Sequence, residues 1–62
     1  MKQVIFTVEL SDLQALALAQ LVKRIGWKEV RINAVDDDEA YEMMDAIARL
    51  QASLADTGYA PR

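Results

Sequence analysis

Hydrophobic and polar residues alternate along residues 2–10, which read KQVIFTVEL. Successive side chains of an extended chain point to opposite sides, so Val4, Phe6 and Val8 fall on one face. Four residues of the stretch are β-branched and one is aromatic, which is typical of strands. The pattern therefore predicts a β-strand over residues 2–10.

A helical period begins at residue 11. Ser11 followed three residues later by Gln14 is the pattern of a capping box, so we expect a helix from Ser11 to about Ile25. Leu16 falls outside the apolar face of this helix and is the best candidate for an exposed apolar contact. The predicted apolar face comprises Leu13, Ala17, Leu18, Leu21, Val22 and Ile25.

Two glycine–aromatic pairs are typical of helix ends. Gly26 precedes Trp27, and Gly58 precedes Tyr59. A glycine just past a helix adopts the left-handed conformation easily, and the next residue then packs on the last turn. We expect both aromatic side chains to lie over helix ends.

Residues 28–35, KEVRINAV, alternate again and are open to two interpretations. The preferred one is a short second strand over residues 29–33, which would pair with the first strand and satisfy its backbone groups. The other is a helical turn. In that case the strand at residues 2–10 must pair with another copy of the protein.

A second amphipathic helix is predicted from about Asp37 to Ala55. Its apolar face comprises Ala40, Met43, Met44, Ile47, Leu50 and Leu54, and its opposite face Asp38, Glu42, Asp45 and Arg49.

These elements predict one small domain over residues 1–62, of the α/β (α+β) class, in the order β-α-β-α. A two-stranded sheet is packed by two helices, and helix packing carries the stability because an isolated two-stranded sheet is marginal in water. The predicted core comprises Val4, Phe6, Val8, Leu13, Ala17, Leu18, Leu21, Val22, Ile25, Ile32, Met43, Met44, Ile47, Leu50 and Leu54.

Composition narrows the functional classes. The chain has no cysteine and no histidine, which excludes disulfides and a Cys/His zinc site and favours a reducing compartment. Its net charge of −3 argues against direct nucleic-acid binding, which needs clustered basic residues.

We expect no signal peptide and no membrane span, because the most apolar stretch, residues 13–22, is far shorter than the roughly 20 residues that a span needs. The expected location is the cytoplasm of a bacterial host cell.

Six carboxylates lie between residues 36 and 45. Asp36, Asp37 and Glu39 suit the start of a helix, where they cap it and complement its dipole. The other three, Asp38, Glu42 and Asp45, have the spacing of one helical stripe, in which only Asp45 has an obvious partner, Arg49.

The stripe has two interpretations. It is either a solvated face or a protein-binding surface that occupies a basic groove on a partner, with Asp36, Asp37 and Glu39 in support. A metal site is not expected, because the run lacks the glycine and the spacing of a Ca²⁺ loop.

Enzyme activity is not expected. The chain has no histidine, cysteine or glycine-rich phosphate loop, and Ser11 and Ser53 have no candidate base nearby. We expect no catalytic residue and no cofactor.

Three segments, LAQLVKRIGW, DDDEAYEMMDAI and LADTGYAPR, carry a resemblance. They resemble a family of short uncharacterised bacterial and mobile-element proteins, in which a helix ending in Lys-Arg-apolar-Gly-aromatic precedes an acidic helix start and a Gly-Tyr-Ala-Pro terminus. That family implies no activity.

The small, acidic, cysteine-free chain is also similar to phage anti-CRISPR proteins. That resemblance implies a non-catalytic inhibitor that mimics nucleic acid and blocks a basic groove, such as the DNA-binding groove of a Cas subunit. The alternative hypothesis is a self-associating accessory domain or antitoxin-type antidote that uses the exposed edge of the first strand and Leu16. We expect a monomer or a weak homodimer.

Overall fold

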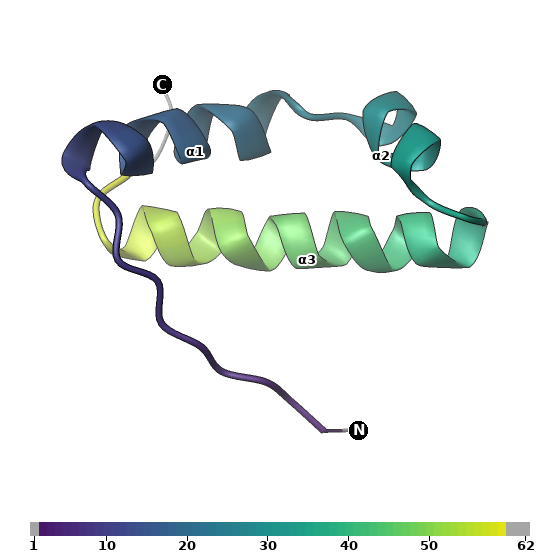
Figure 1. Cartoon of the computed structure of the whole chain (residues 1–62), viewed down its shortest axis with the longest axis horizontal. Coiled ribbons are helices and arrows are strands. Elements are labelled where there is room, and N and C mark those ends of the chain that lie inside the picture. The colour runs from purple at the N-terminus through teal and green to yellow at the C-terminus, as the bar shows by residue number, and fades with distance from the viewer. Residues whose placement is uncertain (1, 60–62) are drawn as a thin grey trace.

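The computed structural model describes residues 2–59, which form an extended segment followed by three helices (Figure 1). α1 spans Asp12–Arg24, α2 spans Trp27–Asn33 and α3 spans Asp37–Asp56. α1 and α2 follow one another along the same side of α3, with α1 beside its C-terminal half (Figure 1). The helices therefore form a single layer, and the chain measures 34 × 28 × 16 Å.

The first helix begins as predicted. The Ser11 hydroxyl accepts a hydrogen bond from the Gln14 backbone N–H at 3.1 Å, and Gln14 Oε1 accepts one from the Ser11 N–H at 2.9 Å. These two bonds satisfy backbone groups that the first turn leaves without helical partners. The capping box is confirmed, and α1 ends one residue before the predicted boundary.

The third helix is also close to its prediction, and its C-terminal signal is confirmed. Gly58 has φ 97° and lies just past the helix. The Gly58 N–H donates to the Ala55 carbonyl and the Tyr59 N–H to the Leu54 carbonyl, the two bonds of a Schellman motif. Tyr59 packs against the cluster that contains Leu54, as predicted.

The prediction for Gly26 and Trp27 is wrong. Gly26 has φ −115° and ψ −177°, an extended conformation, and caps the start of α2 rather than the end of α1. Its N–H donates to Glu29 Oε1 at 2.8 Å. Trp27 is the first residue of α2, and its ring centroid lies 4.8 Å from that of Tyr41 on α3.

The predicted second strand and the two-stranded sheet are also wrong. Residues 29–33 lie within α2, and residues 2–59 contain no strand, so the described chain is all-helical rather than α/β. Trp27 contacts α3, and Val30 is 3% exposed and Ala34 half-buried. Trp27, Val30 and Ala34 are spaced by three and four residues, which fits a helix as well as the alternation fits a strand. Packing on α3 decides in favour of the helix.

The core is smaller than predicted, and alanines occupy three of the six buried positions in the described chain. They allow close approach of α1 to α3, while larger side chains remain at the margins. Of the predicted core, only Val22 and Leu54 are buried, and Leu18, Ile25, Met43, Met44 and Ile47 are half-buried. The rest is exposed: Val4, Phe6, Val8, Leu13, Ala17, Leu21, Ile32 and Leu50. The buried residues are Ala15, Ala19, Val22, Val30, Ala40 and Leu54.

Candidate functional site

The extended segment before α1, residues 2–10, is the most unusual part of the molecule. It leads away from the helices (Figure 1), and within residues 2–59 its backbone forms no hydrogen bond. Phe6 is 78% exposed and Ile5 is 93% exposed. The segment has the sequence of a strand and an extended backbone. The residues that were predicted to pair with it, 29–33, form part of α2 instead.

Part of the predicted apolar face of α1 is also uncovered. Ala15, Ala19 and Val22 mark the line that faces α3, because they are the buried residues of α1. At about 100° per residue, Leu21 lies far from this line, and it is 56% exposed. Leu13 is 78% exposed on another side of the helix. The helix thus presents large apolar side chains that the other described residues leave exposed.

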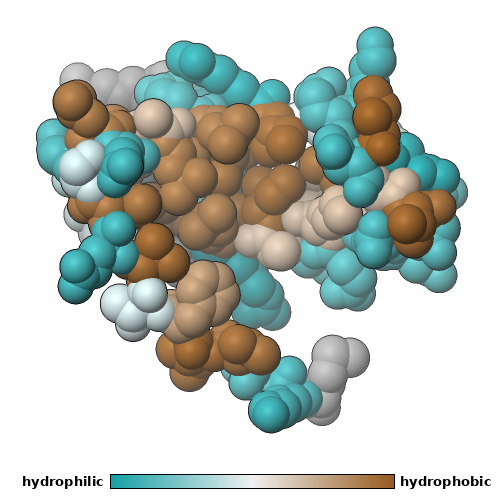
Figure 2. Space-filling model, in the orientation of Figure 1, coloured by the Kyte–Doolittle hydropathy of each residue, from teal (hydrophilic) through white to brown (hydrophobic). Residues whose placement is uncertain are grey.

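Figure 2 shows where these side chains gather. Hydrophobic groups spread over α1 and the adjoining side of α3, and a second hydrophobic stretch lies on the segment before α1. Leu16 is 46% exposed, in line with its predicted position outside the packed face. Exposed large apolar side chains therefore gather on α1 and residues 2–10, and others lie on α2, on α3 and in their connection, as at Ile32, Tyr41 and Val35.

The exposed area is large for a chain of this size. The chain exposes 5410 Å², whereas a folded monomer of 7.0 kDa exposes about 4,000 Å². The radius of gyration is 12.6 Å, whereas a compact chain of 62 residues has about 10.6 Å. The excess of roughly 1,400 Å² is surface that a typical domain of this mass buries.

The structure gives half of the acidic run an intramolecular role. Asp36 Oδ1 accepts from the Glu39 N–H at 2.9 Å and caps α3. Glu39 reaches back to the Val35 N–H at 2.9 Å, one residue before the position that a capping box requires. Asp37 pairs with Arg31 Nε at 2.6 Å. These three carboxylates hold the connection between α2 and α3.

The other half, the stripe of Asp38, Glu42 and Asp45, is exposed on α3. Within residues 2–59 none of the three accepts a hydrogen bond or forms an ion pair, and the predicted pair of Asp45 with Arg49 is absent. They lie on the side of α3 opposite Ile47 and Leu54, which pack in the core cluster. Their protein-binding role stays a prediction.

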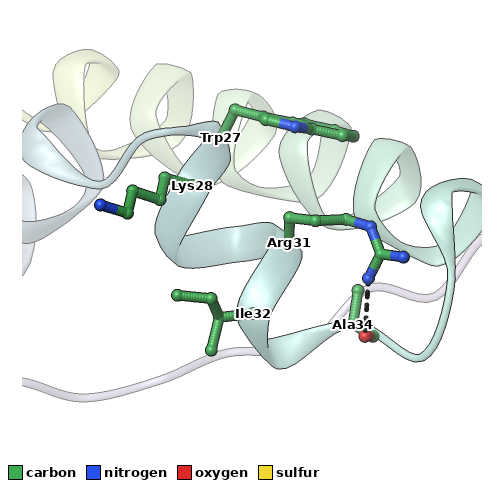
Figure 3. Close-up of a pocket in the computed structure, with 5 residues that line it drawn as sticks. All are labelled: Trp27, Lys28, Arg31, Ile32 and Ala34. Atoms are coloured by element: carbon green, nitrogen blue, oxygen red, sulfur yellow. Dashed lines mark hydrogen bonds between the residues drawn. The ribbon is translucent and has the colours of Figure 1, made fainter.

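A depression on α2 is lined by Trp27, Lys28, Arg31, Ile32 and Ala34 (Figure 3). Arg31 bends toward the end of the helix, where Nη1 donates to the Ala34 carbonyl at 3.1 Å. Lys28 and Ile32 point away from the other side chains drawn (Figure 3). Because the guanidinium is already used within the chain and the depression is open to solvent, we assign it no ligand.

The phenol of Tyr59, just past the end of α3, donates a hydrogen bond to Asp12 Oδ1 at the start of α1. This bond raises the pKa of Tyr59 above its ordinary value, with smaller contributions from partial burial and the negative charge of Asp12. The contact is structural, since it connects helix ends rather than lining a cavity.

No group of metal-binding side chains is assembled in the described part of the chain. No three acidic side chains among residues 2–59 are grouped to hold a metal ion. Ser11 is engaged as a helix cap and Ser53 lies exposed on α3. None of the helices within residues 2–59 is long and apolar enough to cross a membrane.

The arrangement defines a class of protein: a small single-layer helical domain whose exposed features are surfaces rather than an enclosed site. The chain belongs to a family of unknown function (DUF7706), whose sequence profile matches residues 1–62. The match supports the resemblance to a family without an assigned activity, but shows neither a mobile-element nor an anti-CRISPR identity. No curated protein and no solved structure matches the chain.

One signal in the sequence could have located the uncovered surface. α1 carries large apolar residues on nearly all sides, as at Leu13, Leu18 and Leu21. A helix of this kind is buried by more than one neighbour. The three described helices offer few neighbours, so this excess of apolar positions predicts that part of α1 stays exposed.

Proposed function

We propose that this protein is a non-catalytic interaction domain that adds residues 2–10 as a β-strand to a protein partner. One observation carries the proposal: a segment with strand sequence is extended, exposed and without a backbone hydrogen bond within residues 2–59. Strand addition is a common mode of recognition, in which main-chain hydrogen bonds give affinity and alternate side chains give specificity.

Pairing would stabilise the segment in two ways. Its free backbone groups would bond with those of a neighbouring strand. Its alternate apolar residues, Val4, Phe6 and Val8, would leave water together, at about 25 cal/mol for each Å² of apolar surface removed. The exposed side of α1 would extend the same contact.

Proline scanning in cell extract tests the proposal. When a strand pairs along one of its edges, every second backbone N–H is bonded to the neighbouring strand. At least one of the neighbouring substitutions Thr7→Pro and Val8→Pro must therefore remove a ladder bond. We expect the wild-type chain to elute in a complex larger than its own 7.0 kDa, and one of the two variants to elute as the free chain.

Thr7→Ala and Val8→Ala, which keep the N–H, are the matched controls, and each should retain more of the complex than a proline variant that removes a ladder bond at the same position. The proposal fails if both proline variants elute in the same complex as the wild type, or if the wild type itself elutes as the free chain.

A second candidate function rests on the stripe of Asp38, Glu42 and Asp45. These three exposed carboxylates have no partner within residues 2–59, and they would be attracted to a basic groove on another protein, with a strong dependence on salt. Glu42→Lys should weaken binding to such a partner, whereas Asp56→Lys at the end of the same helix should not. Equal binding by the two variants would contradict this candidate.

A further inference from the structure

We infer that the partner of residues 2–10 is a second copy of this chain, paired in an antiparallel two-stranded ribbon with Phe6 beside the two-fold axis. The inference rests on the proposed strand addition and names its partner. It concerns a contact between two chains, each of which keeps the three-helix fold.

The first argument is that the unused groups are self-complementary. Residues 2–10 need a strand with free backbone donors and acceptors, and the rest of the described chain offers none. The same segment in a second copy has the same need. A two-fold axis satisfies both at once, because the same patch is used on each subunit.

The second argument is area. The chain exposes 5410 Å², roughly 1,400 Å² more than a compact monomer of its mass. A stable interface of standard size removes about 800 Å² from each partner, so the excess can accommodate a dimer of this kind. A second copy brings another uncovered α1 face, which would help to cover the two-stranded ribbon.

The third argument fixes the register. Residues directly opposite in a ribbon point to the same face, so the apolar faces of two identical strands coincide only if paired residue numbers add to an even sum. If the numbers of paired residues add to 12, every residue from 2 to 10 has a partner in the second copy. The ribbon then ends just before Ser11, which caps α1. This register places Phe6 opposite its own copy, and Ile5 opposite Thr7 of the second copy.

The mass of the purified chain is the first test. Light scattering over a range of concentrations should give twice the 7.0 kDa of the chain, with little change at high salt because the contact is apolar and backbone-bonded. Phe6→Asp should weaken the dimer about 100-fold or more, since each dimer contains the change twice at its centre. Ile5→Asp, on the outer face, should weaken it less than about 10-fold.

The register is tested with thiols, because the natural chain has no cysteine. Ile5→Cys mixed with Thr7→Cys under oxidising conditions should give a disulfide-linked pair, since opposite residues lie within disulfide range at about 4.5–5.5 Å between Cα atoms. Ile5→Cys mixed with Asp56→Cys is the control and should give far less product.

The outcomes separate the two proposals. A monomeric purified chain, or equal cross-linking in both mixtures, overturns the second-copy inference. If the chain is monomeric when pure but proline variants still release it from a complex in extract, strand addition holds with a different protein as partner. If neither purified chain nor extract shows a complex sensitive to proline, both fail.

Discussion

α3 and the segment at residues 2–10 both have a regular hydrophobic period, but only α3 finds its partners within the chain. α3 packs along α1 and α2, and its Ala40 is completely buried. The segment forms no backbone hydrogen bond within residues 2–59, and its Phe6 is 78% exposed. A hydrophobic period specifies that a face is buried, and it does not specify which chain buries it.

The largest expected effect follows from removing the segment. A chain that begins at Ser11 keeps the capping box and all three helices. We expect its melting temperature to be lower and independent of concentration, whereas that of the full chain rises with concentration. At 100 to 1,000 times the dissociation constant the loss is about 2.7–4 kcal/mol. Thermal melts followed by circular dichroism at several concentrations measure it, and identical melts of the two chains would contradict the prediction.

Two leucines sharpen the comparison within the helices. Leu54 is 9% exposed in the core cluster, so Leu54→Ala should cost about 2–4 kcal/mol in the free energy of unfolding at any concentration. Leu21 is 56% exposed, so Leu21→Ala should lower stability only at concentrations where the chain associates. Urea unfolding at high and low concentration separates the two. Equal losses for Leu21→Ala at both concentrations would show that its cover comes from within the chain.

The two glycines offer a smaller contrast. Gly58 has φ 97°, so Gly58→Ala should cost about 1 kcal/mol by forcing a side chain into the left-handed conformation. Gly26 is extended, and an added Cβ would meet only the end of the Glu29 side chain at 3.3 Å, so Gly26→Ala should cost a few tenths of a kcal/mol. Denaturant midpoints of the two variants check the order, and a larger loss at Gly26 would refute it.

The smallest effect concerns pH. Because the pKa of Tyr59 is raised above 10.0 in the folded chain, its bond to Asp12 contributes fully below that value and is lost as pH rises through the higher folded pKa. In a Tyr41→Phe background, phenolate absorbance should show Tyr59 titrating later than a free tyrosine, and Asp12→Asn should bring the titration earlier. An unchanged titration in Asp12→Asn would exclude the bond as the cause.

Sequence reasoning succeeded where local chemistry decides the structure. The cap at Ser11, the cap at Asp36 and the left-handed Gly58 each depend on residues only a few positions apart, and all three are confirmed. It failed at residues 29–33, because a segment of seven residues fits both the helical and the strand period, and packing on α3 decides in favour of the helix.

The candidate site was predicted only in part, for a related reason. The strand pattern of residues 2–10 and the stripe of Asp38, Glu42 and Asp45 are visible in the sequence. Which side of α1 meets α3 is not, because the line of Ala15, Ala19 and Val22 is less hydrophobic than the line it replaces. Close approach between helix backbones favours small residues over large ones. The pattern of hydrophobic positions in one sequence does not show this preference.

The most direct test of the central claim is amide hydrogen exchange across residues 3–10, measured at a high concentration and after dilution. If these residues form the ribbon, every second amide should be protected at high concentration, because alternate residues of an antiparallel pair exchange both backbone bonds with the other strand. The protection should disappear on dilution, while that of α3 persists. Uniformly fast exchange across the segment at the highest concentration would contradict the account.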